Sequence, residues 1–308
     1  MLGVVVPCHN ENAVLPEFHR RLAAAMDDMN EAWTVTFIDD GSTDGTLALL
    51  ERLRDGHANV AVLSLSRNFG KEVATTAGLD HTPGDAVIVI DADLQDPPEL
   101  IPQLVAAWKR GFDTVYAQRN ARHGETWLKR TTASLFYRLM QKNRQVPLPP
   151  NVGDFRLMSR RVVDAVLSMR EQHRFMKGIF AWVGFSSCAV PYDRAPRAAG
   201  QTSWTYWRLW NLAVEGITGF TVMPLKVATY LGLVVAAGAI LYGSSVVVIT
   251  MVFGNPVPGY PSLLTVMLFL GGIQLVTLGV IGEYLGRIFN ETKGRPLYLL
   301  ERKLPPRE

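Results

Sequence analysis

A chain of 308 residues with 48% hydrophobic and 19% charged residues suits one large or two ordinary domains, which excludes a disordered protein. Its formal net charge is only +3, which gives no support to a broad surface for nucleic acid. The two cysteines, Cys8 and Cys188, have no metal-ligand spacing; they predict a reducing compartment and small core residues, and they argue against a disulfide scaffold.

The first 120 residues alternate between strand patterns and helix patterns, and the opening ten have no basic leader, so we expect this part in the cytosol. Strands are predicted at LGVVVP, VTFID, AVLSLS, AVIVID and TVYAQ. Helices are predicted at residues 13–29, at 43–54 behind an N-cap at Ser42, near 70–79, and from Pro97 or Pro98. This order predicts an α/β fold, a mostly parallel, Rossmann-like sheet with helices on both faces. Neither GxGxxG after the first strand nor GxxxxGK[ST] is present, so neither a dinucleotide fingerprint nor a P-loop is supported.

Polar side chains follow three of the predicted strands. They are Pro7, Asn10 and Glu11 after the first strand, Asp39 and Asp40 after the second, and Asp91 and Asp93 after the fourth. Ligands of open α/β sheets bind at the carboxyl ends of the strands, so we expect these side chains to line one crevice.

Strand alternation places Asp91 and Asp93 on the same side of the chain, where two carboxylates repel unless a cation lies with them. The oxygen ligands predict Mg²⁺ or Mn²⁺, with substrate phosphates completing its shell. Glu11, Asp39 and Asp40 would then accept hydrogen bonds from the base and ribose of a nucleotide. The alternative is that Asp91 and Asp93 only form a turn or helix cap before Pro97; the two other acidic strand ends weigh against it.

The segment GETWLKRTTASLFYRLMQK predicts a helix with Arg130, Ser134 and Arg138 on one stripe. Arginine suits the binding of phosphate, because its fork can contact two phosphate oxygens at once. An ordinary amphipathic helix packed on the core is the alternative.

Residues 227–282 contain no Asp, Glu, Lys or Arg. The segments 227–253 and 262–281 each have the roughly 20 apolar residues that a membrane-spanning helix needs. Lys and Arg flank the outer ends and are missing from the turn, which predicts both ends in the cytoplasm. Before the first span, Trp204, Trp207 and Trp210 predict an interfacial helix at 201–224. Gln274 and glycines 271, 272, 279, 282 and 286 suggest close helix contacts within or between subunits, and hence a homo-oligomer.

The whole chain resembles the family-2 glycosyltransferases that act on polyprenyl phosphates. The resemblance rests on VVPCHNE, IDDGSTDGT, RNFGKE, DADLQDPPE, VGDFRLMSR, FMKGIFAWVG and RAAGQTSWTYWRLWNLAVEGITGF, followed by two spans and GEYLGRIFNETKGRP. Bactoprenol glucosyltransferases are the most similar group, and dolichol-phosphate mannose synthases are more distant. The family implies a GT-A domain at 1–200, a hairpin at 225–290 and a cytosolic tail at 291–308. It also implies transfer of a sugar from a nucleotide diphosphate to a lipid phosphate with inversion.

The resemblance also implies roles for single residues. The catalytic set is Asp91, Asp93 and Asp154; the nucleotide-sugar set is Pro7, Glu11, Asp39, Asp40, Lys71 and Asp91; the metal set is Asp93 and Gln95; and the acceptor-phosphate set is Arg119, Arg130, Ser134 and Arg197. The acceptor, a phosphate monoester with a second pKa of about 6, is largely dianionic at neutral pH and needs little deprotonation. Asp154 is therefore either a base or an orienting or structural residue. The family commonly has Lys or another polar residue where this chain has Ser203; if a Lys there contacts phosphate, one cation is lost, and Arg194 could compensate.

The leading hypothesis is a bacterial inner-membrane enzyme that moves glucose from UDP-glucose to undecaprenyl phosphate, with a flippase and a downstream glycosyltransferase as partners. A donor with mannose or a modified pentose stays open. A processive polysaccharide synthase is disfavoured because QxxRW is missing; the nearest segment, at 172–175, reads QHRF. A non-catalytic membrane scaffold that binds nucleotide sugar is the third reading, and the complete set of acids argues against it.

Overall fold

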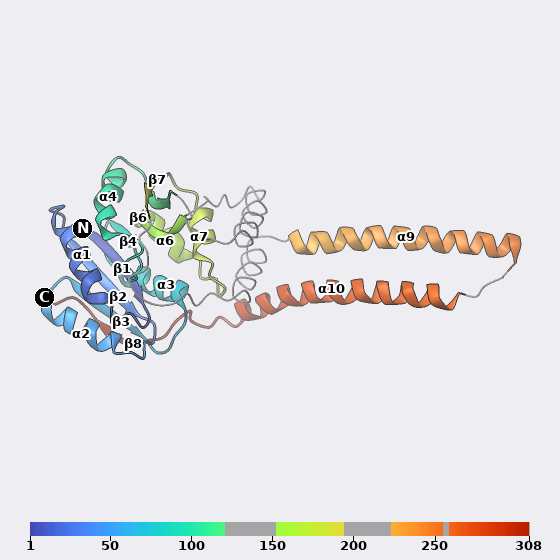
Figure 1. The fold of residues 1–308 in the computed structure, drawn as a ribbon, viewed down its shortest axis with the longest axis horizontal. Helices are drawn as coiled ribbons and strands as arrows, with labels where there is room; N and C mark the ends of the chain where they lie inside the picture. The colour runs from blue at the N-terminus through green and yellow to red at the C-terminus, as the bar shows by residue number, and fades with distance from the viewer. Residues whose placement is uncertain (121–151, 194–222, 255–258, 308) are drawn as a thin grey trace. The chain divides into compact units, whose positions relative to one another are not determined.

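The computed structural model describes residues 1–120, 152–193, 223–254 and 259–307 (Figure 1). Contacts divide the chain into two units, Met1–Leu209 with Arg295–Glu308, and Trp210–Gly294. The predicted arginine stripe lies outside the described residues, and so does the predicted interfacial helix apart from its last two residues. Both therefore stay predictions.

The first unit is built on an eight-stranded sheet with the order β7-β5-β6-β4-β1-β2-β3-β8. The strands are β1 Leu2–Cys8, β2 Trp33–Asp39, β3 Val60–Leu65, β4 Ala86–Val89, β5 Thr114–Arg119, β6 Val152–Ser159, β7 Ser187–Tyr192 and β8 Leu300–Leu304. The four neighbours β4, β1, β2 and β3 are parallel, whereas β6 and β8 run antiparallel to their partners. Every residue of β3 and β4 is buried, as near-continuous apolar runs predict for a covered parallel sheet.

Helices cover both faces of this sheet, as predicted. They are α1 Leu15–Asp27, α2 Thr46–Gly56, α3 Lys71–His81, η1 Pro98–Leu100, α4 Ile101–Lys109, α6 Arg160–Ser168 and α7 Met176–Trp182. Val4 and Val6 of β1 share a core with Phe18 of α1, and the alternate residue Val5 faces α3. A Cβ on Gly78 of α3 would lie only 2.3 Å from Val5 Cγ1, so glycine lets this helix pack closely on the sheet.

The predicted N-cap of the second helix is wrong. Helix α2 begins at Thr46 behind Gly45, whose φ of 87° is in the left-handed region that favours glycine. Asp44 Oδ1 accepts a hydrogen bond from the Thr46 backbone N–H at 3.1 Å. The hydroxyl of Ser42 accepts instead from the backbone N–H of Asn10 at 3.0 Å, so it joins the loops after β1 and β2.

The segment that follows the apolar hairpin in the sequence returns to the sheet. Strand β8 pairs antiparallel with β3, and Arg302 forms an ion pair with Glu51 at 2.9 Å. The sequence LERKL has no alternation of apolar and polar residues, so it did not predict a strand. In the structure only its two end leucines are partly buried. A charged strand is typical of a sheet edge, where one row of backbone groups stays unpaired. The expected cytosolic tail thus contains an edge strand of the first unit.

The second unit contains two long helices that contact each other, α9 Met223–Phe253 and α10 Tyr260–Thr292. Pro224–Phe253 and Phe269–Thr292 are long and apolar enough to cross a membrane, with mean hydropathies of 2.2 and 1.4. Their large apolar side chains are mostly exposed, which a bilayer would satisfy. Within the described chain, the glycines at 271–286 make no close helix contact, since a Cβ there would meet nothing within 4 Å. Close contact between subunits stays a prediction.

Candidate active site

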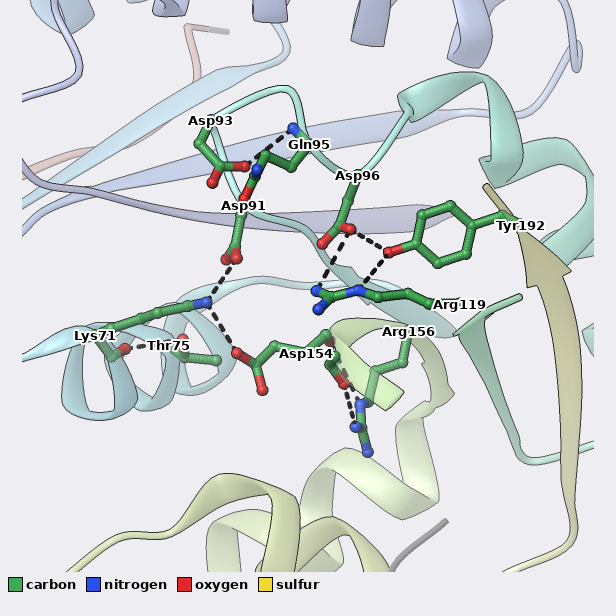
Figure 2. A network of polar contacts seen from close by, with 11 residues as sticks. Lys71, Thr75, Asp91, Asp93, Gln95, Asp96, Arg119, Asp154, Arg156 and Tyr192 are labelled. Carbon is green, nitrogen blue, oxygen red and sulfur yellow. Dashed lines mark hydrogen bonds and ion pairs between the residues drawn. The ribbon is translucent and has the colours of Figure 1, made fainter. Parts of the chain in front are cut away.

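One lysine joins two acids at the carboxyl end of the parallel strands. Lys71 begins α3, Asp91 follows β4, and Asp154 lies on β6 (Figure 2). The Lys71 ammonium donates to Asp91 Oδ2 at 2.6 Å and to Asp154 Oδ2 at 2.8 Å. The structure thus brings together three predicted site residues that are up to 83 positions apart in the sequence.

The pKa values of Lys71, Asp91 and Asp154 are shifted in different directions by burial and by their neighbours. Burial raises the pKa of Asp91 more than Lys71 lowers it. Burial would also raise the pKa of Asp154, but Lys71 and Lys177 outweigh it and hold that pKa well below the ordinary value. The side chain of Lys71 is 45% exposed; desolvation of its ammonium opposes the charge, but the pKa of Lys71 is raised because the ammonium faces both acids. Asp154 is therefore ionised and a weak base.

Within the described residues, one oxygen of Asp91 and one of Asp154 lack a hydrogen-bond partner. Asp91 Oδ1 and Asp154 Oδ1 are buried and have no hydrogen-bond partner in the described chain. An unpaired buried polar atom costs free energy, typically about 1 to 3 kcal/mol. Their positions beside the shared lysine indicate a site that a ligand or water completes.

The predicted same-side arrangement of Asp91 and Asp93 is wrong, because β4 ends at Val89, before either acid. The chain turns here, and Leu94 takes a positive φ of 58°. Asp91 reaches toward Lys71, whereas Asp93 lies beside Gln95 and accepts from its backbone N–H at 3.1 Å (Figure 2). The two acids therefore serve different neighbours.

The predicted metal ligands, Asp93 and Gln95, supply carboxylate and amide oxygens, the donor atoms that Mg²⁺ and Mn²⁺ prefer. Asp93 is half-buried at the turn. Among the described residues, no group of three or more His, Cys, Asp and Glu side chains is placed to hold a metal. Mg²⁺ is commonly held by one or two carboxylates, with substrate phosphates and water completing its shell. The donor set fits a metal that binds together with a diphosphate, and does not fit a protein-enclosed metal centre.

The acids after β2 have two different environments. Asp40 is buried and accepts from the backbone N–H groups of Phe69 at 2.7 Å and Gly70 at 2.9 Å, so it holds the loop that leads into α3. Asp39 is buried, burial raises its pKa, and its Oδ1 has no partner among the described residues. Glu11 and Pro7 are half-buried at the neighbouring end of β1. The three strand ends do meet at one edge of the sheet, as predicted.

Arg119, at the end of β5, belongs to a network that the sequence did not reveal. Its Nε lies 3.2 Å from the hydroxyl of Tyr192, and its Nη2 lies 3.9 Å from Asp96 Oδ1. Asp96 is the third acid of DADLQDPPE, which was an available signal, whereas Tyr192 belongs to none of the quoted motifs. The other predicted phosphate ligands, Arg130, Ser134 and Arg197, lie outside the described residues.

Glu72 is a second residue that sequence reasoning missed. Burial and the neighbouring Asp154 raise its pKa to about 8, and its carboxylate accepts a hydrogen bond from the backbone of Met176, the first residue of α7. Its position directly after Lys71 in RNFGKE was the only signal. Glu72 thus links the first turn of α3 to α7.

Two protein families match different parts of the chain. Residues 3–167 match Glycosyl transferase family 2, and residues 223–288 match the GtrB C-terminal hairpin. The bactoprenol glucosyl transferase of Shigella phage SfX is 49% identical over 300 residues, which is 97% of this chain and 98% of that protein. A prophage bactoprenol glucosyl transferase homolog of Escherichia coli K12 is 48% identical over 301 residues, 98% of each chain.

One further relative and one solved structure are also similar to this chain. An uncharacterized glycosyltransferase of Synechocystis is 49% identical over 299 residues, 97% of this chain and 94% of that protein. Among solved structures, the glucosyl-3-phosphoglycerate synthase of Mycobacterium tuberculosis, in complex with Mn²⁺, UDP-glucose and phosphoglyceric acid, aligns with a TM-score of 0.47 and 22% identity. The alignment covers 70% of this chain and 76% of that one.

Proposed function

The chain belongs to glycosyltransferase family 2, and from this premise we propose that it transfers glucose from UDP-glucose to undecaprenyl phosphate with inversion. The predicted GT-A fold followed by two apolar helices is confirmed. The observation on which the proposal chiefly rests is the 48–49% identity, over almost the full length of both chains, to proteins named bactoprenol glucosyl transferase. Transfer of mannose or a modified pentose is the second candidate.

The proposed reaction forms one bond and breaks one. An oxygen of the lipid phosphate attacks the anomeric carbon of glucose from the face opposite the diphosphate. The bond between that carbon and the diphosphate oxygen breaks, and UDP leaves with the electron pair. Because the acceptor is a dianion above its second pKa of about 6, no proton has to be removed from it. The step needs positioning and stabilisation of the leaving group.

The site residues suit these needs. Asp154 is a poor base, because Lys71 and Lys177 hold its pKa well below the ordinary value. Its contact with Lys71 indicates that it orients the lysine. The Lys71 ammonium, directed toward Asp91, can stabilise negative charge that develops on the diphosphate. A divalent cation held by Asp93 and Gln95 would neutralise the same diphosphate.

The membrane part of the proposal has two supports. The segments before and after the α9–α10 hairpin both contribute strands to one sheet, so the hairpin must begin and end on the same side of a bilayer that it crosses. Lys and Arg flank these ends, which favours the cytoplasmic side of a bacterial inner membrane. A flippase, a downstream glycosyltransferase and a homo-oligomer remain predictions about its partners.

The test uses the purified full-length protein with undecaprenyl phosphate, Mg²⁺ or Mn²⁺, and a panel of UDP-glucose, GDP-mannose and pentose donors. We expect one glucose per lipid by mass spectrometry, with inverted configuration by NMR. Asp93→Asn should lower the rate by about 100-fold, since a metal that stabilises transferred charge is worth several kcal/mol. Asp164→Asn, on the exposed side of α6, is the matched control and should keep the wild-type rate. No lipid-linked sugar, or an Asp93→Asn variant as active as wild type, would reject the proposal.

A further inference from the structure

A tyrosine, an aspartate and an arginine from three different elements meet beside the candidate active site. Tyr192 ends β7 and Arg119 ends β5, and the two residues are direct partners in the sheet register. The Tyr192 hydroxyl donates to Asp96, in the loop after β4, and accepts from Arg119 Nε at 3.2 Å (Figure 2). One hydroxyl group therefore connects the acidic loop to the arginine.

Tyr192 is held so firmly that its hydroxyl has little freedom. The residue is 6% exposed, and its ring packs edge-on against Phe155 with centroids 6.5 Å apart. Its backbone carbonyl accepts from the Asn120 N–H at 3.0 Å. Burial and the charge of Asp96 raise the pKa of Tyr192, so the hydroxyl keeps the proton that it donates.

The arginine that Tyr192 holds points its outer nitrogens toward the catalytic acids. Arg119 Nη2 lies 3.0 Å from the position that a Cβ on residue 153 would take, and glycine at this position leaves the space open. The next residue, Asp154, is bonded to Lys71. The charge of Asp91 helps to raise the pKa of Arg119, and Asp91 also accepts a hydrogen bond from Lys71. The guanidinium and the ammonium therefore both act on Asp91, and two cations near one place favour a bound anion.

A second trio of the same residue types shows what a purely structural arrangement looks like. Arg170 donates through both terminal nitrogens to Asp80, at 2.8 and 2.6 Å, and Tyr298 donates to the same carboxylate at 2.9 Å. That fork is fully used. In the Tyr192 trio, the hydrogen bond of Arg119 uses Nε, and its Nη2 stays at 3.9 Å from Asp96, beyond hydrogen-bond reach. Among the residues that the structure describes, the outer nitrogens of Arg119 have no hydrogen-bond partner, so its fork is available to a ligand there.

We propose that Tyr192 is a positioning residue, which uses its contact with Asp96 to orient the guanidinium of Arg119 toward the phosphate of the acceptor lipid. This inference rests on the proposed function for the identity of the acceptor. A planar fork binds two phosphate oxygens only if its plane is fixed, and an arginine held through Nε loses less side-chain freedom when the phosphate arrives. Tyr192 thus contributes to acceptor affinity without touching the acceptor.

The experiment measures binding of undecaprenyl phosphate in detergent micelles to the full-length protein by equilibrium titration. Tyr192→Phe removes only the hydroxyl, and we expect about tenfold weaker binding, as for the loss of one charge-assisted hydrogen bond. The KM for UDP-glucose should change by less than about twofold. Tyr298→Phe is the matched control, because it removes the same contact from the saturated trio, and it should bind the lipid as wild type does.

A double-mutant cycle separates positioning from general damage. Arg119→Lys keeps the charge and lacks the fork, so it should weaken lipid binding by itself. If Tyr192 acts through Arg119, adding Tyr192→Phe to this variant should weaken binding by less than about twofold more. Should Tyr192→Phe fail to fold, which its thermal unfolding would reveal, Arg119→Lys must by itself show the loss of lipid affinity with an unchanged KM for UDP-glucose.

Each outcome decides the inference. Wild-type lipid affinity in Tyr192→Phe, additive losses in the cycle, or a loss confined to UDP-glucose would overturn it, as would a wild-type protein that does not bind the lipid phosphate. If wild type binds the lipid, Tyr192→Phe weakens that binding, and no glucose is transferred from UDP-glucose, the inference stands and the proposed function fails.

Discussion

The two ends of helix α3 carry polar networks of opposite design. At its first residue, the cation Lys71 is shared by two carboxylates, those of Asp91 and Asp154. Near its last residue, the carboxylate of Asp80 is shared by Arg170 and Tyr298. Both Asp80 oxygens are paired, whereas one oxygen of each acid beside Lys71 has no partner in the described chain. A saturated network stabilises the fold, whereas unpaired buried oxygens are typical of sites that a ligand or water completes.

The helix itself favours neither network. A lysine at the N-terminus and an aspartate near the C-terminus each place a charge beside the like-signed end of the helix dipole. Both are offset by residues from other elements, including Tyr298 in the segment that returns after the hairpin. The tertiary structure therefore supplies the partners that neutralise the unfavourable charges at the ends of α3.

The largest effect is expected from Lys71→Met, which removes the shared cation and leaves the two acids facing each other. We expect the rate of glucose transfer to fall by about 100- to 1000-fold, the usual effect of losing a group that stabilises transition-state charge. The control is Lys109→Met, because Lys109 pairs with Glu31 at the protein surface; it should stay within about twofold of wild type. A Lys71→Met enzyme with near-wild-type kcat would show that the network is structural at both ends.

At the Lys71 end of α3, the neighbouring residue Glu72 should make stability depend on pH. Burial and Asp154 raise the pKa of Glu72 from 4.5 to about 8, so between these values the folded protein keeps a proton that the unfolded chain has lost. Stability from this group is present below pH 4.5 and is lost as the pH rises toward 8. Glu72→Gln avoids the loss and should be more stable at pH 7, by at most about 3 kcal/mol. Thermal unfolding of both proteins should show the gain shrinking at pH 5; an equal difference at both pH values would contradict the assignment.

The smallest change is expected from Asp80→Asn, which weakens the saturated network. Loss of charge-assisted hydrogen bonds should lower the free energy of unfolding by about 1 to 3 kcal/mol. Glucose transfer should stay within about threefold of wild type, since both oxygens of Asp80 are already paired with Arg170 and Tyr298. Denaturant unfolding and the transfer assay, run on the same preparation, measure both effects. A fall in transfer comparable to that of Lys71→Met would mean that α3 couples its two ends.

Local patterns in the sequence were enough for much of the fold. Apolar runs such as AVIVID predicted the buried strands, although β4 ends at Val89, two residues before the first acid. That early end overturned the same-side arrangement of Asp91 and Asp93, because side-chain alternation holds only within a strand. The N-cap at Ser42 was wrong for a related reason: the hydroxyl bonds to Asn10 of a neighbouring loop, and this preference is not visible in the local sequence.

Local patterns of the sequence were sufficient for the α/β class, the apolar hairpin and the family, because apolar periodicity and motif chemistry are local properties of the chain. The roles of the site residues stay predictions. Only the tertiary structure decided that Lys71 joins Asp91 to Asp154, that Tyr192 meets Arg119 and Asp96, and that β8 returns to the sheet. These contacts join residues from 20 to about 240 positions apart in the sequence. Each contact depends on strand order and register, which local patterns do not resolve.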